Sequence, residues 1–189
     1  MMNRRQAILA LALLTAGCTA TASPPDTSIR AVRAASAADF PPIALGAFTP
    51  SRTLRRGADR SVNLRGMTIK PANKRSFSQF LGETIEVQLR LAAKLDPASP
   101  IRLSGEMTEI SVNTAVGKAG GAIAATFRLT LRDRVVFEKT LRGEASWNGS
   151  FIGAVAVMNS EREYAALYPQ LVETLFADPD FRAALRAAR

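Results

Sequence analysis

Three consecutive stretches in the second half of the chain alternate apolar and polar residues with the period of a β-strand. The first, 101–112, changes phase near 107–109, which predicts a β-bulge at that point. The second, 123–131, alternates without a break, and the third, 135–147, follows a tight connection over 132–134. This pattern predicts three antiparallel strands in a sheet with one buried face and one hydrated face.

Helical periodicity precedes and follows these strands. Ser76 and Gln79 have the spacing of a capping box, and the apolar residues after them predict a helix that runs to about Leu95. A second capping box, Ser160 with Glu163, predicts the start of a C-terminal helix.

Three prolines mark where predicted elements bend, begin or end. Pro71 ends a single strand that is expected over 62–69 with one change of phase. Pro169 must either kink the C-terminal helix or stand in its first turn. Asp178 and Pro179 have the residue types of an N-cap and a first helical position, so they predict the start of a last helix.

The order of these elements predicts an α+β fold of two layers, with helices packed on one face of an antiparallel meander sheet. We expect this domain over 61–189. Residues 40–60 form a basic, partly ordered lead-in, within which 40–48 is either a first edge strand or a linker. Residues 18–39 are rich in Ala, Ser, Thr and Pro and predict a flexible tether.

The first 17 residues have the pattern of an export signal peptide. Two arginines precede a hydrophobic stretch, 8–15, which is too short to span a bilayer because a span takes about 20 apolar residues. Ala16-Gly17 then leads into Cys18, the only cysteine of the chain. This arrangement resembles the lipobox of bacterial lipoproteins, although Thr15 stands where that family usually has Leu. The alternative is an ordinary secretory signal that happens to contain a cysteine.

The lipobox resemblance implies a lipid-anchored protein. The signal would be cut before Cys18, and Cys18 would receive fatty acyl chains such as palmitate, so that the bilayer is its first partner. Lipoprotein sorting usually marks inner-membrane retention with an Asp after the cysteine. Here Thr19 takes that place, which implies the periplasmic face of the outer membrane.

Composition narrows the chemistry of the mature chain. The formal charge is +9 and falls to +7 when the two arginines of residues 1–17 are removed. An exported and tethered chain meets anionic lipid head groups first, so we expect no nucleic-acid partner. The chain contains no histidine, and this removes the commonest general base and the commonest metal ligand. We therefore expect no metal, no cofactor and no enzymatic activity.

Two motifs resemble catalytic or phosphate-binding features. The acidic pairs Glu83/Glu86 and Glu106/Glu109 can be interpreted as a glycosidase-like site, but we favour their interpretation as hydrated surface acids. The Gly-rich stretch 117–121 lies between two predicted antiparallel strands and has no helix after it, so it predicts a hairpin loop.

The best candidate for a contact surface is the apolar run 151–158 with Trp147 before it. Its residues Phe151, Ile152 and Val155 form either a buried strand or connection, or an exposed surface for a partner chain or an acyl group. Trp147 fits both interpretations, as a core side chain or as an anchor.

The tether, the helix, the meander and the motif 175–181 together resemble the YajG-type small lipoproteins, over about residues 76–188. A looser likeness exists to LptE-type and ABC-transporter auxiliary lipoproteins. The first resemblance brings no established activity with it. We therefore expect a non-enzymatic binding or envelope-assembly component with an envelope protein or a lipid as partner. The alternative is an auxiliary subunit of a lipid or lipopolysaccharide transport system.

Overall fold

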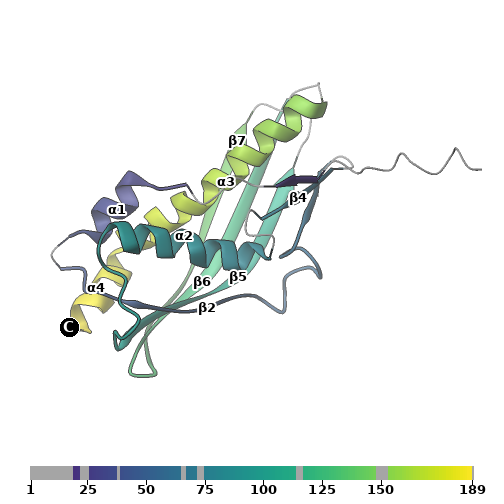
Figure 1. Ribbon diagram of the computed structural model, residues 1–189. Helices are drawn as coiled ribbons and strands as arrows, with labels where there is room; N and C mark the ends of the chain where they lie inside the picture. Colours follow the sequence, from purple (N-terminus) through teal and green to yellow (C-terminus); the bar gives the residue numbers. More distant parts are fainter. Residues whose placement is uncertain are drawn as a thin grey trace, which may run out of the picture.

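The computed structural model describes residues 19–21, 26–37, 39–64, 67–71, 75–113, 117–147 and 153–188. Its elements follow in this order: β1 (Thr19–Thr21), α1 (Ile29–Ala35), β2 (Ala44–Pro50), β3 (Val62–Leu64), β4 (Met67–Lys70), α2 (Phe77–Leu91), β5 (Ile101–Asn113), β6 (Ala119–Leu131), β7 (Arg134–Trp147), α3 (Gly153–Ala177) and α4 (Pro179–Ala187). The predicted α+β class is confirmed (Figure 1).

The main sheet has the strand order β2-β5-β6-β7 (Figure 1). The three predicted meander strands are antiparallel neighbours, and the register between β5 and β6 shifts between Met107 and Glu109, where the bulge was expected. Arg132 and Asp133 both have positive φ angles, 47° and 69°, in the hairpin between β6 and β7. Two positive φ values in a two-residue turn match the right-handed twist of the flanking strands.

The first strand of the main sheet resolves the open choice over 40–48. β2 is an edge strand, and it pairs with β5 in the parallel direction, so the sheet is mixed rather than a pure antiparallel meander. Phe48 fixes the position of β2 between α2 and β5, because its ring packs against Gly82 of α2 and Gly105 of β5. A Cβ atom at Gly105 would lie 2.6 Å from the Phe48 ring.

A second, smaller sheet has the strand order β1-β4-β3. The prediction of a single strand over 62–69 is wrong, because the structure has two strands there, β3 and β4, which pair as antiparallel neighbours. β1 adds to the other edge of β4 in the parallel direction.

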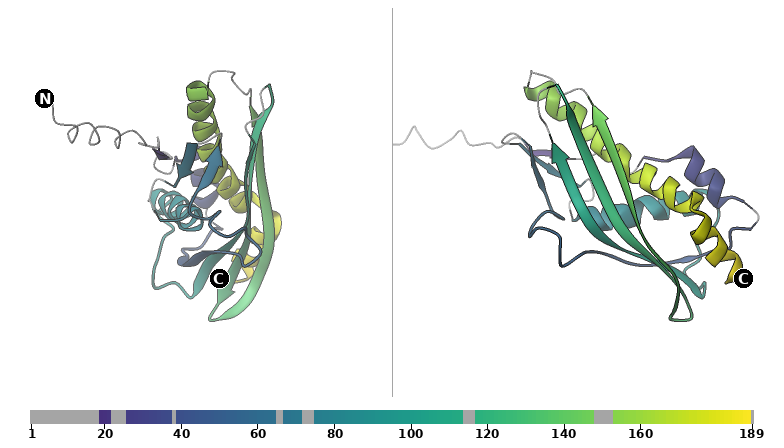
Figure 2. Two further views of the ribbon diagram at one scale, coloured as in Figure 1. Left: turned by 90° about the vertical axis from the view of Figure 1, so that its right-hand side faces the viewer. Right: turned by 180° about the vertical axis from the view of Figure 1, so that it is seen from behind.

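The helices pack on one face of the main sheet, as the alternating pattern predicted (Figure 2). The core is continuous between the layers and includes an aromatic cluster of Phe40, Phe137, Phe176 and Phe181 at one end. A second cluster joins α2 to α3. Its members, Phe77, Phe80, Tyr164 and Tyr168, are at most 1% exposed. Burial raises the pKa of the Tyr164 and Tyr168 hydroxyls above the ordinary tyrosine value.

Part of the expected tether is a packed helix. α1 lies within 18–39, its residues Ala31 and Ala35 are fully buried, and it contacts α3. Glu173 of α3 accepts hydrogen bonds from Ser28, at 3.0 Å, and from Arg30, at 3.4 Å. The buried face of α1 consists mainly of alanines. Because the whole segment is rich in Ala, these alanines do not stand out in the sequence as a helical apolar pattern.

The predictions for α2 and α4 hold at their N-termini. Ser76 is the N-cap of α2 and Asp178 is the N-cap of α4, with Pro179 in the first position. α3 differs, because it begins at Gly153 rather than at Ser160, and Pro169 therefore lies inside the helix. The expected capping box at Ser160 is wrong, because Ser160 is an interior helical residue.

Candidate functional site

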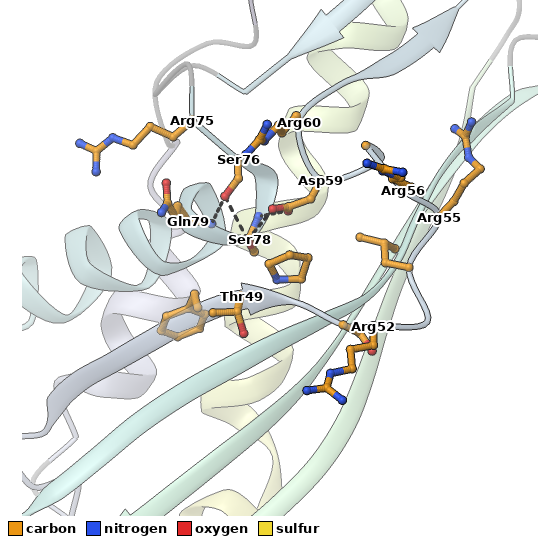
Figure 3. A pocket seen from close by; sticks show the side chains of 15 residues that line it. Thr49, Arg52, Arg55, Arg56, Asp59, Arg60, Arg75, Ser76, Ser78 and Gln79 are labelled. Carbon is orange, nitrogen blue, oxygen red and sulfur yellow. Dashed lines mark hydrogen bonds between the residues drawn. The ribbon is translucent and has the colours of Figure 1, made fainter.

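A cleft of about 1080 Å³ lies where the end of β2 meets the start of α2 (Figure 3). Its wall comes from the segment 51–60 between β2 and β3 and from the first residues of α2. The lining is basic, and its arginines are Arg52, Arg55, Arg56, Arg60 and Arg75.

The segment 51–60 is a succession of turns rather than a strand or helix. The Ala58 amide donates to Arg55 O at 2.9 Å, and the Arg60 amide donates to Gly57 O at 3.0 Å. Gly57 has φ +83°, which a side chain would disfavour. Ser51 donates its amide to Met107 O of β5 at 2.8 Å, so the segment is fixed to the main sheet at its start.

Asp59 fixes the other end of this segment. Asp59 is 9% exposed, and its carboxylate accepts two hydrogen bonds from Ser78, from the amide at 2.8 Å and from the hydroxyl at 2.9 Å. Asp59 O also accepts from the Phe77 amide at 2.7 Å. The third amide at the start of α2, that of Gln79, donates to Ser76 Oγ. The first three amides of the helix are thus all hydrogen-bonded within the chain. Among the described residues that line the cleft, Asp59 is the one acid, and its carboxylate is bound to the first turn of α2 (Figure 3).

The arginines of the segment have no such partners. Within the described ranges, Arg52, Arg55, Arg56 and Arg60 are exposed, and their guanidinium groups form neither an ion pair nor a hydrogen bond. Elsewhere in the fold, arginines such as Arg128, Arg142 and Arg182 pair with carboxylates. The cleft thus concentrates unpaired positive charge beside a concave surface, which is an arrangement that attracts anions.

The predicted contact surface is only partly described. Trp147 is half-buried at the end of β7, and its Nε1–H donates to Ser160 Oγ of α3 at 3.0 Å. Its ring also lies over β6, because a Cβ atom at Gly121 would lie 3.2 Å from the ring. Trp147 therefore joins the sheet to α3.

The other residues of the predicted contact surface, and the predicted lipidation site, fall wholly or partly outside the described residues. Phe151, Ile152 and Cys18 lie outside the described residues, and so does the side chain of Val155. The backbone of Val155 belongs to α3, so the run 151–158 is helical from Gly153 onward rather than a strand.

The acidic pair Glu106/Glu109 lies on the hydrated face of the sheet. The Arg142 guanidinium donates to Glu109 at 2.8 and 3.3 Å and holds the pKa of Glu109 below its ordinary value. A carboxyl that acts as a general acid needs a raised pKa instead. In the other pair, Glu86 forms an ion pair with Arg90 one turn along α2.

Two further observations concern the described part of the chain alone. It groups no three Cys, Asp or Glu side chains in a way that could hold a metal ion. No helix in it is long and apolar enough to cross a membrane.

Comparison with known proteins identifies the fold but no family. No family model matches the chain, and no curated protein is similar to it in sequence. Among solved structures, protein XCC0632 from Xanthomonas campestris, described as belonging to family DUF330, is similar with a TM-score of 0.56 at 13% identity. That similarity covers 84% of this chain and 92% of the other.

Two further solved structures are similar at lower scores. A proposed lipoprotein from Caulobacter crescentus has a TM-score of 0.48 at 10% identity and covers 84% of this chain and 97% of its own. A minor lipoprotein from Acinetobacter baumannii has a TM-score of 0.41 at 10% identity, with coverage of 70% and 87%. The similarity to XCC0632 shows a shared fold, and a shared fold does not fix an activity.

Proposed function

We propose that this chain is a lipoprotein of the bacterial envelope that acts as a non-enzymatic binding component. The anchor is supported by the sequence, because the hydrophobic stretch 8–15 leads through Ala16-Gly17 into Cys18. Thr19 after the cysteine favours the periplasmic face of the outer membrane. The YajG-type resemblance remains part of this proposal.

The binding role rests on one observation, the group of unpaired arginines around the cleft. A guanidinium group presents several N–H donors in a plane, which suits phosphate and carboxylate oxygens. Arg52, Arg55, Arg56 and Arg60 offer four such groups within one segment of ten residues. The ligand is therefore an anion, and phosphate is the chemistry that fits best.

The same observation favours a second proposal, an auxiliary subunit of a lipid or lipopolysaccharide transport system. Phospholipids and lipopolysaccharide carry phosphate groups, and the cleft has the volume of a small-molecule site. The two proposals share the site and differ in whether the bound molecule is passed on to another protein.

The anchor is tested with Cys18→Ser and fractionation in 1 M salt. The wild-type chain should incorporate labelled palmitate and stay with the membranes, because several acyl chains bind almost irreversibly and salt does not screen their burial. Cys18→Ser should incorporate no label and leave the membranes at high salt. A variant that stays with the membranes in 1 M salt would contradict the proposal.

The binding site is tested by thermal unfolding with inorganic pyrophosphate at low salt. At a concentration tenfold above the dissociation constant, the melting temperature should rise by roughly 3–5 °C. Arg55→Gln/Arg56→Gln should lose most of this rise. The matched control is Arg132→Gln/Arg134→Gln, which removes two exposed arginines from the β6–β7 hairpin and should leave the rise unchanged. A rise that is equal in both variants would place the bound anion elsewhere.

A further inference from the structure

The whole net charge of the mature chain belongs to one segment. Residues 40–75 contain eight Lys and Arg residues and one acid, Asp59. Residues 76–189 contain thirteen basic and thirteen acidic residues, and 18–39 contain two of each. The excess of +7 in the mature chain is thus the charge of 40–75 alone.

The described basic residues of this segment lie at one end of the molecule. The end of β2, the turns 51–60, the β3–β4 pair and the start of α2 lie together at this end in Figure 1. The arginines of the cleft and Lys70 of β4 are exposed there. The β6–β7 hairpin and the C-terminus lie away from this end (Figure 1).

β1 brings the start of the mature chain to the same place. Thr19 pairs with Thr68 of β4, which pairs on its other side with Asn63 of β3 (Figure 1, the dark purple arrow beside β4). Cys18 immediately precedes Thr19 in the sequence. Two strand spacings of about 4.8 Å and three residues of about 3.3 Å each separate Thr19 from Arg60, so the Cα of Thr19 lies within roughly 20 Å of that of Arg60.

We propose that the acylated Cys18 and the arginine cleft face the same bilayer, and that the cleft binds the phosphate head groups of anionic phospholipids in it. This inference rests on the proposed function, because it assumes that Cys18 carries the anchor. In this arrangement the domain has a fixed orientation relative to the bilayer, whereas a flexible tether would leave its orientation free. An anchor that is one residue from a paired strand holds the basic end of the domain at the membrane surface.

Electrostatics favours the membrane as the occupant. The attraction between arginines and head groups falls off within a Debye length, which is about 8 Å at physiological ionic strength. A domain on a long free tether would spend most of its time outside that range, whereas β1 keeps the cleft close to it. Each basic residue near an anionic surface strengthens binding about fivefold.

The inference is tested with vesicles and the mature chain, residues 18–189, carrying Cys18→Ser so that acyl chains make no contribution. Vesicles of phosphatidylcholine are compared with vesicles that contain 30% phosphatidylglycerol. We expect binding to the phosphatidylglycerol vesicles alone, weakening as salt is raised. Arg55→Gln/Arg56→Gln should weaken it by roughly 25-fold, whereas the control Arg132→Gln/Arg134→Gln, with the same change in net charge, should weaken it less than twofold.

A second measurement tests the orientation in the lipidated protein. Because Cys18 is the only cysteine and is acylated, a new cysteine can be labelled alone. A fluorophore at Thr53→Cys should be quenched by head-group quenchers, and one at Asp133→Cys in the β6–β7 hairpin should not. Equal quenching at the two positions would overturn the fixed orientation.

The outcomes separate this inference from the proposed function. If pyrophosphate stabilises the chain but phosphatidylglycerol vesicles do not bind it, the cleft serves a soluble anion or an acidic protein, and the inference is overturned while the proposed function stands. If neither binds, both are overturned.

Discussion

The carboxylate of Asp178 accepts three hydrogen bonds at the start of α4. Its carboxylate accepts hydrogen bonds from the Asp180 and Phe181 amides, both at 3.0 Å, and Lys139 of β7 donates to it at 2.7 Å. Burial alone would raise the pKa of Asp178, but these hydrogen bonds hold it below its ordinary value. The residue therefore caps a helix and joins that helix to the sheet edge.

Asp178→Ala should lower the free energy of unfolding by about 1–2 kcal/mol, because it removes an N-cap and leaves two amides without a side-chain partner. Urea denaturation measures this. The control is Asp180→Ala, since Asp180 also contacts Lys139 but its side chain is 70% exposed, and it should cost less than about 0.5 kcal/mol. Equal losses in the two variants would contradict the capping role.

Phe48 lies between two glycines, Gly82 and Gly105, which leave no room for a Cβ atom. Gly105→Ala should cost about 1–3 kcal/mol, because the Phe48 ring must move and α2 blocks the other side. Adding Phe48→Leu should recover part of the loss, so that the two substitutions are not additive in urea denaturation. Additive losses would show that the ring has room to move.

The elements differ in how far the sequence predicts them. The strands β5, β6 and β7 alternate because one face of the sheet is dry, and the bulge at 107–109 follows from the change of phase at Ile110 and Val112. The parallel pairing of β2 could not be predicted, because it depends on a partner about 58 residues away, with Ala44 opposite Arg102. The alternation of apolar and polar residues within β2 does not indicate which distant strand it pairs with.

The arginine cleft was missed for a related reason. Its arginines were visible as a basic lead-in, but Arg75 is separated from Arg60 by the β3–β4 pair, and only the fold brings them to one cleft. The signal that could have revealed it is the charge balance, since residues 76–189 are neutral as a group.

α1 offers a direct test of the difference between a tether and a packed helix. Ala31 is fully buried, so Ala31→Asp would place an unpaired charge against α3 and should release α1 from the core. Trypsin should then cut at Arg30 and Arg33 at least tenfold faster than in the wild-type chain. The control Arg33→Gln changes an exposed position and should leave cutting at Arg30 unchanged. Equal cutting in all three chains would mean that α1 is not packed.

For the whole molecule, three ion-paired acids predict how stability depends on pH. The pKa of Asp39 is lowered by Arg182, and the pKa values of Glu109 and Asp178 are also below their ordinary values. Such groups stabilise the fold above the ordinary carboxyl pKa, near 4, and lose that effect as the pH falls through the lowered values. Burial raises the pKa of Glu161, so this residue has the opposite effect on the pH dependence of stability. It is a single group, whereas three acids have lowered pKa values.

Urea midpoints should therefore be nearly constant from pH 7 to pH 5 and fall steadily below about pH 4. The variant Asp39→Asn, which cannot titrate, should be less stable at pH 7 and show a shallower fall. A midpoint that rises on acidification would contradict this assignment.

The contacts of the N-terminal elements also limit the order in which the chain can assemble. Ser28 and Arg30 contact Glu173, and Asp39 pairs with Arg182 and Arg186, so these contacts close loops of more than 140 residues. The hairpins β5–β6 and β6–β7, by contrast, close locally. In a chain that is translocated N-terminus first, α1 enters early but cannot complete its contacts until the last residues follow. The acylation of Cys18 that we propose requires none of those last residues. Lipid attachment would thus precede completion of the core, and the domain would finish folding while already held at the membrane.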